Sequence, residues 1–199
     1  MELINELKEI LRATQERQRQ LQQFSEEYSV YYGRAVENFE APNAEPMTEV
    51  TDGDIVLLHP SLLSSGSRPV KAMVFSVTAT AWENNHKEDC VVITPISPLS
   101  TPAFSWEFEV DEQTEKMVLQ LWNTRCLPES LLKRCWKVGE LSQDAVDDAF
   151  DVYQHLDTGR ELPERLRAKT LIKLSSEDSN SMIKDYYQRE HALVDDLEL

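Results

Sequence analysis

Short strand-like segments separated by polar turns fill the middle of this chain, and they constrain its fold more than any other feature. Residues 55–59, 70–82 and 90–96 are rich in β-branched, aromatic and other apolar side chains, and a polar connection at 83–89 predicts a hairpin. Residues 104–110 alternate apolar with polar side chains, which predicts a strand with one buried and one wet face. Several short strands in succession favour a small antiparallel meander barrel over a parallel sheet.

The N-terminus is predicted to form one amphipathic helix over residues 2–30. Seven residues follow one another at alternating steps of four and three, the spacing of a heptad seam: Leu3, Leu7, Ile10, Thr14, Arg17, Leu21 and Phe24. Such a seam packs either on the chain's own domain or on the helix of a second chain, and the spacing fits both. The polar Thr14 and Arg17 weaken a continuous coiled coil.

A second helix is predicted over residues 142–157, because apolar residues recur there at helical spacing. Ser142 is suited to cap its N-terminus, and Gly159 is suited to end it. From about residue 175 the chain is polar, with a weak helical pattern around Ile183 and Tyr186. We expect this tail to be partly ordered.

Together these segments predict an α+β protein in three parts. Residues 1–45 form a helical extension and a linker, residues 46–172 a small antiparallel β-barrel followed by a helix, and residues 173–199 an acidic tail. The linker is placed at residues 40–50, which hold two prolines and no periodic pattern. Six residues are predicted to lie in the buried core: Val56, Met73, Val92, Ile93, Phe108 and Phe150.

Charge and composition exclude several classes of function. The 36 acidic and 20 basic residues give a net charge of −16, which repels nucleic-acid phosphates at long range and excludes a passive DNA-coating role. The three cysteines suggest neither a disulfide framework nor a zinc site, and the four histidines are scattered, so no metal or other cofactor is expected. No apolar run is long enough for a membrane span, and residues 1–15 alternate charged residues with Leu and Ile instead of placing a basic segment before an apolar run, so no signal peptide is expected. We therefore expect a cytoplasmic chain without membrane contact.

Three pieces of the sequence, taken in order, resemble the PemK/MazF family of toxin-like small barrels. The first is similar to the family's GDIV strand, loop and RP strand, the second to its VVxxPhT strand end, and the third to a later strand and the GxLS turn before its terminal helix. The matching segments are residues 53–58 (GDIVLL), 68–74 (RPVKAMV), 91–97 (VVITPIS), 121–125 (LWNTR) and 138–142 (VGELS). The resemblance covers about residues 50–157.

The resemblance implies an SH3-like barrel with a terminal helix, usually as a homodimer. It also implies an antitoxin-like protein partner lying in the RNA groove, and metal-independent cleavage of single-stranded RNA in which Arg68 and Ser97 serve the reaction. Cleaving RNA through its own 2′-hydroxyl needs charge stabilisation rather than a protein nucleophile. An arginine can stabilise the phosphorane with its fork of donors, and a serine hydroxyl can orient a phosphoryl oxygen.

Several features favour a second interpretation, a non-catalytic or autoinhibited barrel that acts as a protein-interaction module. The loop at residues 60–67 lacks the Glu-Gln pair that many toxins of the family carry there, and the N-terminal 45 residues have no counterpart in the minimal toxin. An attached helix could fill the groove. Arg68 would then satisfy a loop carbonyl, and Ser97 would cap a turn. A small-ligand cage is a further alternative, although aromatic residues at strand spacing more often form core: Trp82, Trp106, Trp122 and Trp136.

Overall fold

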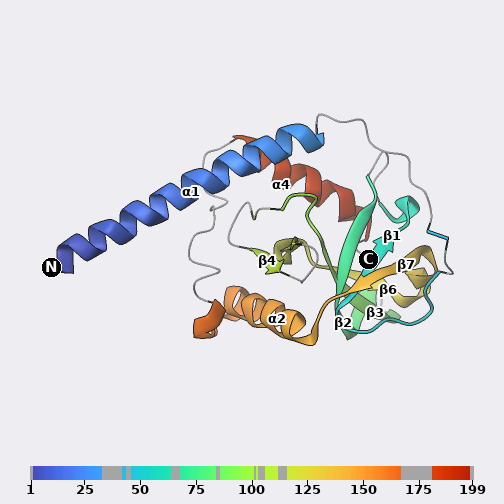
Figure 1. The fold of residues 1–199 in the computed structure, drawn as a ribbon. Coiled ribbons are helices and arrows are strands. Elements are labelled where there is room, and N and C mark those ends of the chain that lie inside the picture. The colour runs from blue at the N-terminus through green and yellow to red at the C-terminus, as the bar shows by residue number, and fades with distance from the viewer. Residues whose placement is uncertain are drawn as a thin grey trace.

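The elements within the described residues include the α-helices α1 (Glu2–Tyr32), α2 (Gln143–Thr158) and α4 (Ser181–Val194) and seven strands. Helix α4 lies alongside the C-terminal part of α1, and α2 lies on the opposite side of the molecule (Figure 1). The bounds of α1 and α2 confirm the two predicted helices. The computed structural model describes residues 2–32, 42–43, 46–63, 68–83, 86–100, 102, 106–111, 116–166 and 181–197. Parts of the predicted loop, hairpin turn, linker and tail lie outside the described residues: 64–67, 84–85, 40–41, 44–45 and 167–180.

Five strands make one antiparallel sheet in the order β6-β3-β2-β1-β7. Their bounds are β1 Asp54–Leu58, β2 Val70–Glu83, β3 His86–Pro95, β6 Arg125–Pro128 and β7 Cys135–Glu140. A separate hairpin is formed by β4 (Glu107–Asp111) and β5 (Lys116–Gln120), and a bridge between Ile96 and Leu119 joins it to the end of β3. The α+β class and the antiparallel pairing are therefore as predicted.

The strand pairings describe an open sheet rather than the closed barrel predicted from the sequence. Within the described residues, β6 pairs only with β3 and β7 only with β1, so these two strands are the edges. The register between β2 and β3 shifts between Val74 and Ser76 and again between Ser76 and Ala79. Such bulges bend and twist a strand pair. The long β2–β3 pair can therefore bend, but within the described residues the edge strands β6 and β7 do not pair with each other.

Both faces of the sheet are buried, which explains why the strands appear in the sequence as nearly continuous apolar runs. On one face, Val56 and Ile93 belong to a cluster that also contains Val194 at the end of α4. On the other face, Met73 packs in a cluster with Phe108 of β4 and with the apolar side of α2. The central strands therefore connect two cores.

The predicted core is confirmed for four residues: Val56, Met73, Ile93 and Phe108. Val92 is only partly buried, and the prediction for Phe150 is wrong, because its side chain is 44% exposed. Helix α2 buries Val146, Ala149 and Val152, and Phe150 is rotated by about 100° from its neighbour Ala149. The ring of Phe150 therefore lies at the margin of the buried stripe, 5.9 Å from that of Phe75.

Two glycines have positive φ values, one in the turn before β1 and one at the predicted end of α2. Gly53 has a φ of 89°, and a Cβ there would lie 2.7 Å from Cγ2 of Val146, so the turn before β1 approaches α2 closely. Gly159 has a φ of 71° and ends α2 in the left-handed region. At the other end of α2, the side chain of Ser142 accepts a hydrogen bond from the backbone N–H of Ala145, which confirms the predicted cap.

Parts of the predicted linker and tail are packed as core. Met47 is buried, and its N–H donates to the carbonyl of Cys135 on β7 at 2.8 Å. In the tail, α4 buries Ile183, Tyr186 and Val194. The acidic C-terminal part of the chain is thus a structural element of the described protein.

Burial distinguishes two phenylalanines that the sequence placed together in the core. Phe108→Ala should lower the free energy of unfolding by about 3–5 kcal/mol, because it removes a buried ring from the packed interior. Phe150→Ala should cost less than about 1.5 kcal/mol, the contribution of one aromatic pair at a partly exposed position. Chemical denaturation of both variants provides the measurement. Equal losses would contradict the placement of Phe150 at the margin of α2.

Candidate functional site

Arg68 stands directly before β2 and is directed into the space beneath α4. Its Nη1 donates to the carbonyl of Pro69 at 3.0 Å, and its Nη2 contacts Oε2 of Glu190 at 2.5 Å. The guanidinium also lies over the ring of Tyr31, 5.7 Å from the centroid. The side chain of Arg68 is 11% exposed and that of Glu190 is 1% exposed. Arg68 therefore satisfies a nearby carbonyl, as one hypothesis supposed, and also forms a buried ion pair.

Ser97 follows β3, where the hairpin of β4 and β5 meets the main sheet. Its N–H donates to the carbonyl of Val118 at 2.8 Å, which fixes the backbone. Its buried hydroxyl accepts from the N–H of Leu99 at 3.1 Å and lies 2.8 Å from the hydroxyl of Tyr186. Ser97 thus caps a turn and also contacts α4.

Tyr186 and Glu190 connect the two predicted site residues, because they stand one turn apart on α4. Gln120, at the end of β5, donates from Nε2 both to the hydroxyl of Tyr186 and to Oε2 of Glu190, each at 2.9 Å. Arg68 and Ser97 are therefore linked through one continuous hydrogen-bond network. The predicted pair does come together, but beneath a helix and not in an open groove.

The network contains a second buried carboxylate. The hydroxyl of Tyr186 donates to Oε1 of Glu107 at 2.7 Å, and the indole Nε1 of Trp122 donates to the same atom at 3.3 Å. Since the one proton of Tyr186 goes to Glu107, the hydroxyl of Ser97 is the donor to Tyr186. Alternation placed Glu107 on a wet strand face, whereas its side chain is 0% exposed. The prediction is wrong at Glu107, which Tyr186 of α4 covers, whereas the side chain of Glu109 on the same face is 38% exposed.

Each carboxylate oxygen of Glu190 has a donor, as a buried charge requires. The hydroxyl of Tyr32, at the end of α1, donates to Oε1, while Arg68 and Gln120 donate to Oε2. Asn123 adds a hydrogen bond to the backbone carbonyl of Glu190 at 3.1 Å. Three segments distant in the chain therefore converge on one residue of α4.

The surroundings shift the pKa values of the groups around this carboxylate. Burial lowers the pKa of Arg68, but the charge of Glu190 and the neighbouring phenols more than offset this and leave it raised. Burial and the nearby charge of Glu190 raise the pKa of Tyr32. Burial, followed by the charges of Glu107 and Glu190, raises the pKa of Tyr186. The guanidinium thus stays charged and both phenols stay protonated donors at neutral pH.

Further contacts hold the outer edge of α4. The ring of Tyr187 stacks on Trp122 with centroids 4.4 Å apart. Nδ1 of His191 contacts Asp195 at 2.7 Å, and its Nε2 lies 3.2 Å from Nη2 of Arg125, on β6. These contacts bind α4 to β6 and to the turn after β5, so the helix is attached along its whole length.

The three tryptophans whose side chains are described do not gather into one cage. Trp122 and Trp106 border the cluster between α1 and α4, whereas Trp136 is buried on β7 beside His59. The side chain of Trp82 lies outside the described part of the chain. The alternative of a small-ligand cage therefore has no support among the three tryptophans whose side chains are described.

The arrangement is suited to holding an anion. The carboxylate of Glu190 is gripped by a guanidinium, an amide and a phenol, which are also donors for a phosphate. The buried Nε of Arg68 has no hydrogen-bond partner among the described residues, so its N–H is an unused donor of the guanidinium. While α4 is in place, the ligand in this site is the chain's own carboxylate.

Sequence reasoning did not identify six members of this network: Tyr32, Glu107, Gln120, Asn123, Tyr186 and Glu190. One signal was present for Glu190. Residues 183, 186, 190 and 194 follow at steps of three and four, so Glu190 stands on the apolar stripe of α4. An acidic residue on such a stripe indicates a buried cation partner. Gln120 carries no comparable signal in its short strand.

Among the described residues, no group of three or more His, Cys, Asp or Glu side chains is placed to hold a metal ion. No helix within the described ranges is long and apolar enough to cross a membrane. Comparisons of the chain with protein-family models, with curated proteins and with solved structures find no match. The case for a function therefore rests on the geometry of the site.

Removing the charge of Glu190 should destabilise the protein strongly. Glu190→Gln leaves the buried guanidinium of Arg68 without its counter-charge, and we expect a loss of about 3–5 kcal/mol in the free energy of unfolding. The matched control is Glu129→Gln at an exposed position, which should change stability by less than about 0.5 kcal/mol. Denaturant titration of both variants tests this. Similar small effects would show that the ion pair does not anchor α4.

Alkaline pH should release α4. A raised tyrosine pKa favours the protonated folded state, so this stability is fully present below the unfolded pKa and is lost as pH rises towards the folded one. For Tyr28, burial and the bond to Asp185 raise the pKa from 10.0 to about 12, and the pKa values of Tyr32 and Tyr186 are also raised. Stability measured by denaturant titration should therefore fall above about pH 10. The fall should be shallower in Tyr186→Phe, and an unchanged slope would contradict the assignment.

Proposed function

We propose that this protein is a PemK/MazF-like barrel in an autoinhibited form, a protein-interaction module whose groove holds its own C-terminal helix. One observation carries the proposal: two residues one turn apart on α4, Tyr186 and Glu190, contact the two residues that the resemblance assigns to the site, Ser97 and Arg68. Apolar packing of α4 alone would not require hydrogen bonds to both Arg68 and Ser97. The buried charge requires a specific partner, and α4 supplies it.

Several features of the fold are compatible with an SH3-like barrel. The β2–β3 pair contains two register shifts, which favour strong bending. The bridge between Ile96 and Leu119 brings the β4–β5 hairpin against the end of β3. The helix α2 then follows β7 directly, as the terminal helix of the family follows its last strand. These features support the proposed family, although the described strands form an open sheet.

The contacts of Glu190 suggest what the groove recognises. Its carboxylate is held by charge-assisted and neutral donors that suit a phosphate equally well. An antitoxin-like partner would therefore need to present an acidic side chain on a helix and to displace α4. Single-stranded RNA would need to replace the same carboxylate with a phosphate.

A second candidate function is a metal-independent endoribonuclease that becomes active when α4 leaves. It is favoured by the convergence of Arg68 and Ser97 on one hydrogen-bond network. With α4 displaced, Arg68 would stabilise the phosphorane formed by attack of the RNA 2′-hydroxyl, and Ser97 would orient a phosphoryl oxygen. The net charge of −16 opposes RNA approach, so cleavage should be weak at physiological salt.

Displacing α4 should reveal whether the groove cuts RNA. The full chain should not cleave single-stranded RNA in EDTA, whereas the variant Tyr186→Ala/Glu190→Gln should, because both contacts that cover the site are removed. Adding Arg68→Ala to that variant should lower the rate by about 100-fold or more, as the loss of one transition-state donor does. Adding Ser97→Ala should cost less. Cleavage is measured on labelled RNA, with the fold checked by circular dichroism.

The outcomes separate the two candidate functions. Cleavage by the full chain at the rate of the opened variant would contradict autoinhibition, and a requirement for metal would exclude the proposed chemistry. A folded, opened variant that neither binds nor cleaves RNA would leave only the interaction module. In that case the opened variant should bind a peptide of residues 181–197, and the same peptide with Glu190→Gln should bind more weakly.

A further inference from the structure

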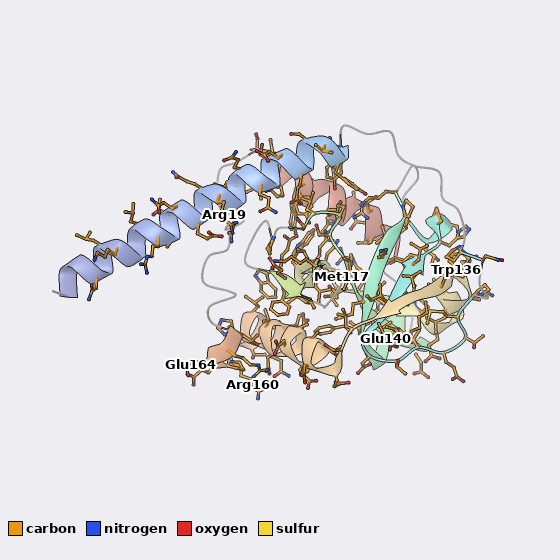
Figure 2. All side chains as sticks on the ribbon, in the orientation of Figure 1. Arg19, Met117, Trp136, Glu140, Arg160 and Glu164 are labelled. Atoms are coloured by element: carbon orange, nitrogen blue, oxygen red, sulfur yellow. The ribbon has the colours of Figure 1, made fainter. Side chains whose placement is uncertain are left out.

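The N-terminal half of α1 projects away from the rest of the molecule (Figure 1). Among the described residues, Leu21 borders the aromatic cluster and Gln23 contacts Ser100, so the C-terminal half of α1 packs on the body. Arg19, labelled in Figure 2, stands just before these two residues of α1. From residue 11 to residue 19 every side chain is exposed except that of Glu16, which is partly exposed. We call residues 2–19 the projecting segment.

The apolar stripe that docks α1 on the body continues along the projecting segment. Leu7, Thr14, Leu21 and Tyr28 follow at steps of seven, so they stand on one face of the helix. In the body-bound half, Tyr28 is buried and Leu21 is partly buried. In the projecting segment, Leu7 and, one turn later, Leu11 are each 58% exposed. The same face is therefore covered at one end of the helix and uncovered at the other.

Charge identifies what fits this uncovered face. The projecting segment holds four acidic and four basic residues, so it is neutral although the whole chain has a net charge of −16. Residues 2–9 hold three of the acidic residues and one basic residue, and residues 10–19 hold the reverse. Two copies aligned antiparallel would set each acidic half against a basic half, whereas parallel copies would set like against like.

We infer that the projecting segment pairs antiparallel with the same segment of a second copy of this chain. With residues 2–19 of the two copies fully overlapped, Glu2 lies opposite Arg19 and Glu9 opposite Arg12, and the face that carries Leu7 and Leu11 in one copy packs against the same face of the other. The segment is about 27 Å long at 1.5 Å per residue, so antiparallel pairing holds the two acidic bodies at opposite ends. Pairing would also stabilise a helical segment that is short for independent stability in water. The inference is independent of the proposed function.

The full-length chain tests this pairing by sedimentation velocity over a range of concentrations. The wild-type chain should dimerise, and Leu7→Gln/Leu11→Gln should raise the dissociation constant by about 100-fold or more, because the apolar layers of the interface are lost. The matched control is Asn5→Gln/Ala13→Gln, two exposed positions on the opposite face of the helix, which should leave the dissociation constant unchanged. Glutamine is a good helix former, so helix content should persist in both variants.

Each other result would overturn the inference. A wild-type chain that remains monomeric at high concentration contradicts pairing, and a dimer that survives Leu7→Gln/Leu11→Gln uses another surface. Small-angle scattering of the wild-type dimer should give an elongated particle with two separated bodies. A compact dimer with adjacent bodies would rule out the antiparallel arrangement. None of these measurements depends on Arg68 or on RNA, so their failure leaves the proposed function untouched.

Discussion

The carboxylate of Glu190 accepts hydrogen bonds from Arg68, Gln120 and Tyr32 in a place that solvent barely reaches. These residues come from α4, the start of β2, the end of β5 and the end of α1. Removing one partner of a buried charge lowers the free energy of unfolding more than removing a neutral contact does. The four elements are therefore held in one arrangement. With Glu190 in this position, Tyr186, one turn towards the N-terminus of α4, contacts Ser97, and Val194, one turn towards its C-terminus, lies in the core.

This arrangement couples the stability of the folded protein to the position of α4 over Arg68 and Ser97. The guanidinium of Arg68 is suited to binding an anion, and it is also the buried charge that Glu190 neutralises in the folded protein. With α4 in place, the cation of Arg68 is buried in a chain whose net charge is −16, and long-range repulsion of polyanions is the expected result. In the proposed function, stability of the closed form and access to the groove oppose each other through the same ion pair.

The sheet explains why α4 can take this position. Both of its faces are buried, one under α2 and β4, the other with Val194 and Met47, so the central strands form the middle layer of the molecule. The helix α4 lies alongside α1, and its residues Ile183 and Tyr186 pack in one cluster with Phe24 and Tyr28 of α1 (Figure 1). Helix α1 thus has two roles: its C-terminal half closes the cluster around Phe24 and Tyr28, and its N-terminal half is left to pair with a second copy.

The sequence was sufficient to predict part of the local structure, namely the helices α1 and α2, the strands β1 to β4 and the stop at Gly159, because period, capping and φ preference act over a few residues. Through the resemblance it also named Arg68 and Ser97. What it could not determine was which face each element covers. Glu107 follows a wet-face alternation, yet a residue 79 positions away in the chain buries it. Periodicity distinguishes two faces of a strand or helix, but only tertiary packing decides what lies against each of them.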